Sequence, residues 1–122
     1  MFPQSVFPDT AEVDSQGQLV LGGIRATDLA DEYGTPVYVL DEDTLRARCR
    51  SFIDEFRKLH PATNVSYACK AYINPALAKI FQEEGMGFDV VSGGELAATI
   101  SAGVPMDEVY FHGNNKTPPE LT

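Results

Sequence analysis

The second half of the 122-residue chain repeats a pattern of strand, turn and helix, and this repeat strongly limits the folds open to it. Strand-like runs occupy residues 64–70, 88–91 and 109–112. Helical patterns follow at Pro75 and Ser92, and a further helix is starting at Thr117. Strands separated by helices of this length predict a parallel sheet. We therefore expect an α/β fold, either a doubly wound sheet or a barrel.

Lys70 lies where the first of these strands ends and the turn toward the next helix begins. Apolar side chains alternate with polar or small ones from Val65 to Lys70, which is the period of a β-strand. In parallel sheets and barrels, ligands bind at the C-terminal ends of the strands. Lys70 is either an ordinary surface lysine or an amine sheltered by apolar neighbours, which loses its proton readily and forms a Schiff base with an aldehyde. The residues alone leave both interpretations open.

Two further titratable side chains lie near the ends of the other strands. Asp89 stands in an apolar run, where burying a carboxylate without a partner is costly, so it either bonds turn amides or faces a ligand. His112 ends the third strand on the same rim, where it either contacts a ligand or stabilises a turn. The segment 92–95 matches a capping box, in which Ser92 accepts a hydrogen bond from the Glu95 amide and the Glu95 side chain reaches back.

The N-terminal part of the chain carries weaker signals. We expect strands at residues 18–21 and 36–40. Between them, a short helix through Tyr33 should end at Gly34.

A longer amphipathic helix is expected over residues 44–59, with Asp41 or Asp43 capping its positive end. Its charged side chains fall on the opposite face and need no functional explanation. The apolar stripe predicts a face packed on the core, formed by Leu45, Cys49, Phe52, Ile53, Phe56 and Leu59.

Composition narrows the classes of function. Nine Lys and Arg against eighteen Asp and Glu give a net charge of −9, which argues against nucleic acid or an anionic membrane as partner. No apolar run approaches the roughly 20 residues that span a bilayer. Cys49 and Cys69 lack metal-type spacing, so we expect no metal site and two buried free thiols of a cytoplasmic protein. Motifs of metallohydrolases, serine hydrolases and nucleotide hydrolases are absent.

Three motifs, in the same order, carry a family resemblance. The segments Tyr-Ala-Cys-Lys-Ala at 67–71, Gly-Phe-Asp-Val-Val-Ser-Gly-Gly-Glu-Leu at 87–96 and Phe-His-Gly-Asn-Asn-Lys-Thr at 111–117 resemble diaminopimelate decarboxylases. These belong to the alanine-racemase-like, fold-type III decarboxylases that depend on pyridoxal 5′-phosphate (PLP). The resemblance runs from about residue 35 to the end of the chain.

The resemblance implies an architecture. Residues 41–122 would form the first helix and about three βα units of a PLP-dependent (β/α)₈ TIM barrel. Residues 1–40 would be an N-terminal segment associated with a second β-domain. A complete barrel takes about 250 residues, so we expect the chain to be the N-terminal part of a longer enzyme.

The resemblance also implies a site. Lys70 would be the catalytic lysine that forms the Schiff base with PLP, and Asp89 would lie beside that imine and tune its protonation. His112 and Glu95 are further candidates for cofactor binding. The cofactor phosphate would be held by a glycine-rich segment late in the barrel rather than by residues 92–95. Tyr72 departs from the family, many of whose members have Asn there, so it takes no transferred role.

The expected activity is that of a carboxy-lyase, the decarboxylation of meso-2,6-diaminopimelate to L-lysine in lysine biosynthesis. Alternatives are a barrel decarboxylase of ornithine, arginine or carboxynorspermidine, or a non-catalytic PLP-binding homologue. A further alternative is a structural fragment that cannot fold alone, because its last parallel strand is an unpaired edge. The family implies a homodimer acting on a small amino-acid substrate, and we expect residues 1–122 alone to be inactive.

Overall fold

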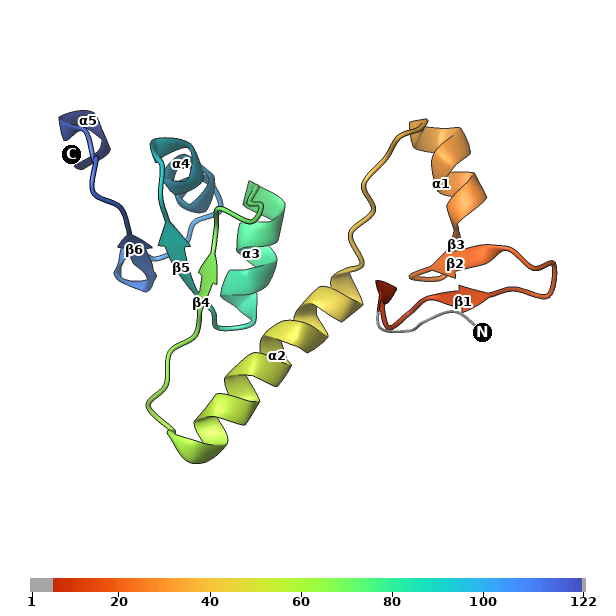
Figure 1. The fold of residues 1–122 in the computed structure, drawn as a ribbon, viewed down its shortest axis with the longest axis horizontal. Helices are drawn as coiled ribbons and strands as arrows, with labels where there is room; N and C mark the ends of the chain where they lie inside the picture. The colour runs from red at the N-terminus through yellow and green to blue at the C-terminus, as the bar shows by residue number, and fades with distance from the viewer. Residues whose placement is uncertain (1–5, 122) are drawn as a thin grey trace. The chain divides into compact units, whose positions relative to one another are not determined.

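The computed structural model describes residues 6–121 and divides into two compact units, Met1–Arg48 and Cys49–Thr122, which are considered separately (Figure 1). The division falls inside a helix, slightly beyond the boundary at residue 40 that the sequence suggests. The assignment of residues 1–40 to a second β-domain stays a prediction.

The first unit contains a small antiparallel sheet in the order β1-β2-β3, formed by Glu12–Val13, Leu19–Leu21 and Ile24–Arg25. Gly22 and Gly23 join β2 to β3 with φ of 55° and 80°. Such positive values at both central residues suit a tight hairpin and favour glycine. The strand predicted at 18–21 is thus confirmed as the middle of a sheet whose two short outer strands the sequence did not reveal.

Helix α1 (Ala26–Tyr33) follows the sheet and ends at Gly34, as predicted, where the Gly34 N–H donates to the Ala30 carbonyl. The strand predicted at 36–40 is wrong. All five residues are exposed, and in the described part of the chain they pair with no strand. Apolar, β-branched residues favour a strand only when a neighbouring strand takes their hydrogen bonds.

Helix α2 (Glu42–Leu59) begins at a capping residue that is also hydrogen-bonded to the N-terminal part of the first unit. Asp41 Oδ1 accepts from the Thr44 N–H at 2.8 Å, which identifies Asp41 as the capping residue. Its Oδ2 accepts from Thr10 Oγ1 at 2.6 Å, and Thr10 Oγ1 in turn accepts from the Gly22 N–H at 3.0 Å. Desolvation opposes ionisation, but these hydrogen bonds together lower the pKa of Asp41 below its usual value.

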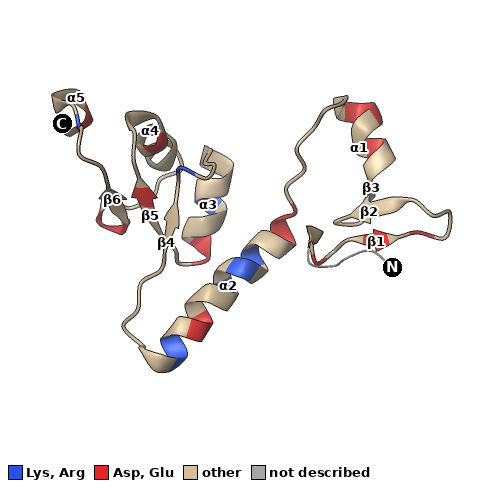
Figure 2. Cartoon of the chain, in the orientation of Figure 1, with Lys and Arg blue, Asp and Glu red and all other residues tan. Residues whose placement is uncertain are grey.

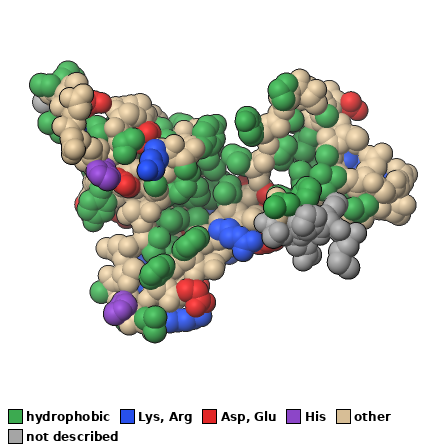
Figure 3. All heavy atoms as spheres, in the orientation of Figure 1, with side chains coloured by type: hydrophobic (Ala, Val, Ile, Leu, Met, Phe, Trp, Pro, Cys, Tyr) green, Lys and Arg blue, Asp and Glu red, His purple; other side chains and the backbone are tan. Residues whose placement is uncertain are grey.

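The apolar stripe of α2 is only partly buried, which corrects the sequence-based expectation. Cys49 and Ile53 are buried, whereas Phe52, Phe56 and Leu59 are 58%, 55% and 79% exposed. Hydrophobic side chains are visible on the surface along this helix (Figure 3). Periodicity predicts that a helix has an apolar face but not which part of that face a neighbour covers. Acidic and basic residues alternate along α2 (Figure 2), for instance the pair Glu42 and Arg46.

The second unit is built on a parallel sheet in the order β4-β5-β6, formed by Ser66–Ala68, Gly87–Val90 and Val109–Phe111. The remaining elements are α3 (Pro75–Glu83), α4 (Gly93–Ser101), the 3₁₀ turn η2 (Met106–Glu108) and α5 (Pro118–Leu121). The predicted parallel α/β fold is therefore confirmed. The predicted helix start at Pro75 is also confirmed, with Asn74 Oδ1 accepting from the Leu77 N–H at 2.8 Å.

The central strand β5 separates the core from the opposite face of the sheet. Phe88 and Val90 are completely buried. Asp89, between them, is 36% exposed and pairs in register with Ala68 on β4 and Tyr110 on β6, both of which are exposed. Because side chains alternate along a strand, Asp89 faces away from the core. The core behind β5 is completed by buried side chains of α3, α4 and the loops: Leu77, Ala78, Phe81, Met86, Thr99 and Val104.

Candidate active site

The three strand ends of the second unit bring the predicted site residues to one edge of the sheet. Lys70 lies in the turn two residues beyond β4, Asp89 is the penultimate residue of β5, and His112 directly follows β6. The strands are parallel and adjacent, so their C-terminal ends meet at the same edge. This is the edge where α/β proteins bind ligands.

Asp89 and His112 face each other across neighbouring strands. His112 Nδ1 lies 3.5 Å from Asp89 Oδ2, and the His112 side chain is 74% exposed. This distance exceeds that of a good N–H···O hydrogen bond, so the attraction is chiefly electrostatic and depends on protonation of His112. The backbone of His112 is fixed more firmly, because its N–H donates to the Val90 carbonyl at 2.8 Å.

The Lys70 side chain is exposed. Among the interactions of residues 6–121, none involves its amine. The turn that carries Lys70 is closed by the Ala71 N–H, which donates to the Ala68 carbonyl at 3.1 Å. The amine is therefore accessible to a reactant while its backbone is held.

Tyr67 supports this turn, a role that sequence reasoning missed. Its hydroxyl donates to the Tyr72 carbonyl at 2.8 Å, and its ring centroid lies 4.3 Å from that of Phe81. Desolvation raises the pKa of the Tyr67 phenol above its usual value. Asn74, the cap of α3, donates to the Tyr72 hydroxyl at 3.3 Å. The Lys70 turn is thus tied both to the core and to the following helix.

Cys69, next to Lys70, is buried rather than exposed. It is 2% exposed, and its N–H donates to the Asp89 carbonyl at 2.9 Å. Desolvation, reinforced by the negative charges of Glu95 and Asp89, raises the pKa of the Cys69 thiol to about 11. The thiol is therefore protonated at neutral pH and is a poor nucleophile. Cys49 and Cys69 are both buried thiols and are not joined by a disulfide, as the sequence predicts.

Glu95 caps α4. The Glu95 N–H donates to Ser92 Oγ at 3.3 Å, which confirms the first half of the predicted capping box. The carboxylate reaches back one residue further than in a standard box, and its Oε2 accepts from the Val91 N–H at 2.9 Å. Its role toward a cofactor stays a prediction.

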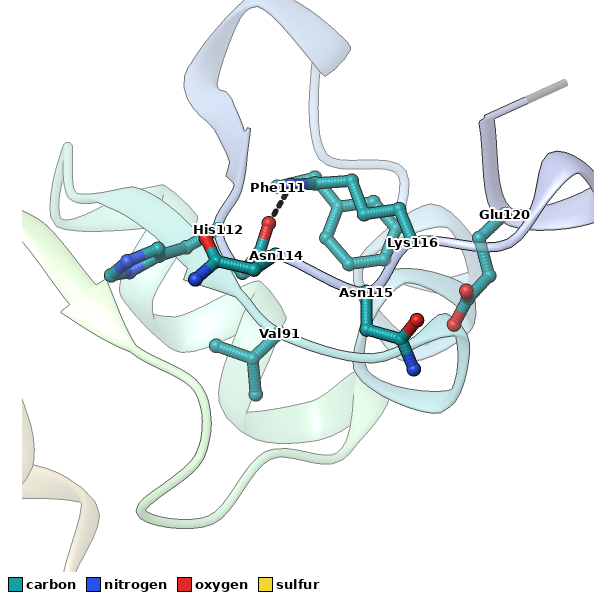
Figure 4. A pocket seen from close by; sticks show the side chains of 8 residues that line it. Val91, Phe111, His112, Asn114, Asn115, Lys116 and Glu120 are labelled. Carbon is teal, nitrogen blue, oxygen red and sulfur yellow. Dashed lines mark hydrogen bonds between the residues drawn. The ribbon is translucent and has the colours of Figure 1, made fainter.

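An open cavity of about 210 Å³ adjoins the strand ends of β5 and β6 (Figure 4). Above it, the Lys116 amine donates to the Gly113 carbonyl and lies 5.4 Å from the centre of the Phe111 ring. The lining residues are Val91, Phe111, His112, Gly113, Asn114, Asn115, Lys116 and Glu120. His112 thus belongs both to the cavity and to the pair with Asp89.

Within residues 6–121, no three His, Cys, Asp or Glu side chains gather in a way that could hold a metal ion. No helix in this range has both the length and the apolar character needed to cross a membrane.

Comparisons with known proteins connect this geometry to a family. The sequence profile described as the pyridoxal binding domain of pyridoxal-dependent decarboxylases matches residues 42–122. The chain is 44% identical over 115 residues to the diaminopimelate decarboxylase of Bacillus methanolicus, covering 94% of this chain and 27% of that relative. It is 44% identical over 116 residues to that of Methanothermobacter thermautotrophicus, covering 95% of this chain and 27% of that one.

A solved structure shares the fold. The crystal structure of the diaminopimelate decarboxylase from M. jannaschii matches with a TM-score of 0.79 and 32% sequence identity, covering 93% of this chain and 27% of that one. A second crystal structure of that enzyme, in co-complex with L-lysine, matches equally well. The chain thus spans about a quarter of the length of these relatives. Because the profile covers most of the chain and the relatives align along nearly all of it, the chain belongs to the pyridoxal-dependent decarboxylases.

Proposed function

We propose that residues 1–122 act as the N-terminal part of a PLP-dependent enzyme that decarboxylates meso-2,6-diaminopimelate to L-lysine. The relatives named diaminopimelate decarboxylase and the M. jannaschii complex with L-lysine support this choice of reaction. The observation that carries it is the accessible Lys70 amine at the C-terminal edge of a parallel sheet, with Asp89 on the adjacent strand. Closure of that sheet into a barrel belongs to the proposal, because the chain spans about a quarter of its relatives.

The residues present fit part of a PLP site. An aldehyde cofactor needs an exposed amine on a fixed backbone, and Lys70 offers one. When bound, the cofactor's pyridine ring supplies an electron sink for the pair left at the substrate Cα after CO₂ departs. Around Ser92, the Val91 N–H already donates to the Glu95 carboxylate and the Glu95 N–H donates to Ser92 Oγ, which supports the expectation that the phosphate is held elsewhere.

Each side chain has a distinct task in this reaction. The Lys70 amine would hold the cofactor at its aldehyde carbon, and as a free amine it would be placed to carry a proton to the substrate Cα. Asp89 places negative charge on the strand next to Lys70, which favours the protonated state of a nearby nitrogen. His112 Nδ1 lies 3.5 Å from Asp89 Oδ2, which places an imidazole beside that carboxylate at the same edge of the sheet. A homodimeric, cytoplasmic enzyme is what the family implies, and that part stays a prediction.

The first test is to incubate the full-length protein with PLP, reduce with borohydride and map the modified peptides by mass spectrometry. We expect a pyridoxyl adduct on Lys70, and its loss in Lys70→Ala. Lys79→Ala is the matched control, because Lys79 is an exposed lysine on α3 engaged with Glu83. Adducts confined to lysines other than Lys70 would refute the proposed cofactor role.

Substrate identity needs a second measurement. We expect CO₂ release from meso-2,6-diaminopimelate at least about a hundred-fold faster, as kcat/KM, than from ornithine, arginine or carboxynorspermidine, a ratio that differential transition-state binding supplies. A Lys70 adduct without CO₂ release from any of these compounds would favour the non-catalytic PLP-binding homologue instead.

A further inference from the structure

One carboxylate joins the starts of two helices near the candidate site. Glu120 Oε2 accepts from the N–H and from the hydroxyl of Thr117, each at 2.7 Å, at the beginning of α5. Its other oxygen, Oε1, accepts from the N–H of Gly93 at 3.1 Å, at the beginning of α4. These hydrogen bonds, led by that from the Thr117 backbone, lower the pKa of Glu120 below its usual value. The group is therefore ionised near neutral pH and makes charge-assisted bonds.

The two helices follow the two strands that carry Asp89 and His112. Helix α4 comes after β5, and α5 comes after β6 and the loop of residues 113–117. The link through Glu120 therefore fixes the end of the β6 loop to the turn that follows β5. At the start of this segment the His112 N–H donates to the Val90 carbonyl, and within the loop the Lys116 amine lies over the Phe111 ring.

Packing at Gly93 supports the same link independently. A Cβ built on Gly93 would lie 3.3 Å from Glu120 Cγ and 3.4 Å from its Oε1. A side chain at Gly93 would therefore press on the Glu120 carboxylate, which would have to move by a few tenths of an ångström. A negative charge at the N-terminal end of α4 is also favoured by the dipole of that nine-residue helix.

The linked segments form the wall of the cavity beside His112. Glu120 lines that cavity together with Val91, which precedes α4, and with Asn114 and Asn115 of the β6 loop (Figure 4). Since Oε1 already bonds the Gly93 N–H, this amide is engaged within the protein and is not free for an anionic group of the cofactor or substrate.

We propose that Glu120 is a positioning residue for the decarboxylation: by tying residues 113–117 to the start of α4, it sets the shape of the cavity next to Asp89 and His112. This inference rests on the proposed function. Glu120 does not touch the reacting atoms, so its loss should impair substrate handling while the reaction of Lys70 with PLP survives.

The test uses the full-length enzyme and three single variants. Glu120→Ala is expected to lower kcat/KM for meso-2,6-diaminopimelate by about ten-fold, the loss that follows from removing a charge-assisted link. Glu120→Gln keeps one acceptor oxygen and should fall between this variant and the wild type. Thr117→Ala removes a local bond of α5 but leaves the link to Gly93, so it should retain more than half of the wild-type kcat/KM. Borohydride trapping of PLP on Lys70 should be unchanged in all three.

A double-mutant cycle separates positioning from general stability. Gly93→Ala crowds the carboxylate and should lower kcat/KM in the wild-type background. In the Glu120→Ala background the crowded group is gone, so Gly93→Ala should have little further effect on kcat/KM. Additive losses, or a normal kcat/KM in Glu120→Ala accompanied only by a lower Tm, would overturn the inference. A wild-type enzyme without a Lys70 adduct or CO₂ release would instead overturn the proposed function itself.

Discussion

Lys70 and Cys69 are neighbours in the chain, yet water reaches them very differently. The lysine is exposed at the turn, whereas the thiol is 2% exposed and held against β5 by the Cys69–Asp89 backbone bond. Two consecutive residues of the turn after β4 thus carry an accessible amine and a buried, unreactive thiol. Because Lys70 is exposed and Cys69 is buried, substitution of each is expected to affect a different property: cofactor attachment for Lys70 and stability for Cys69.

Burial of Cys69 predicts an alkaline loss of stability. Its pKa rises from 9.0 to about 11 on folding, so the folded state keeps the proton longer than the unfolded state does. The resulting stabilisation is complete below pH 9 and is lost as the pH rises toward 11. We expect urea unfolding between pH 8 and 10.5 to show a decline on the order of 1–3 kcal/mol that is absent in Cys69→Ala. Identical pH slopes for the two proteins would contradict this account.

At the scale of the elements, helix starts are where sequence and structure agree best. Ser92 caps α4 as expected, and Asn74 caps α3 directly before the predicted start at Pro75, because a cap depends only on residues within one turn. The link between Glu120 and Gly93 could not be predicted, since it joins residues 27 positions apart. The Lys70–Asp89–His112 edge was predictable because three short motifs fixed the strand ends, and parallel pairing then brought those ends together.

The predictions of a strand at 36–40 and of a fully buried apolar face on α2 are wrong for the same reason. Both depend on what a segment packs against rather than on its own composition. Phe52 and Phe56 have the right spacing for a core face, but in the described part of the chain each stays more than half exposed. Local pattern fixes the type of element, and burial is decided by distant partners.

The cap of α2 offers a matched pair of variants. Asp41 bonds both Thr44 and Thr10, whereas Asp43 is exposed in the first turn of the helix. Asp41→Ala is expected to cost about 1–2 kcal/mol in the free energy of unfolding, and Asp43→Ala less than about 0.5 kcal/mol. Chemical unfolding of the two variants at pH 7 measures the difference. Equal effects would show that dipole attraction, rather than the Asp41 bonds, supports the start of α2.

The chain as a whole exposes sheet edges and apolar side chains of the kind that a stable domain usually covers. Strands β4 and β6 each pair only with β5 among the described residues, so each presents an edge. The exposed Phe52 and Phe56 add an apolar patch on α2. We expect residues 1–122 alone to self-associate in light scattering at micromolar concentration, and Phe52→Ser with Phe56→Ser to reduce this. A monodisperse monomer would contradict the expectation.

The alternation in β5 places two requirements on the same four residues. Phe88 and Val90 fill the core while Asp89 points away from it, so sliding the strand by one position would bury the carboxylate and expose the two apolar side chains. A one-residue slip of β5 would therefore disrupt the core packing and the candidate site together. A one-residue insertion within Gly87–Val90 should therefore lower both stability and activity far more than one in the loop of residues 113–117. In β5 the same alternation of side chains places the core residues on one face and Asp89 on the other.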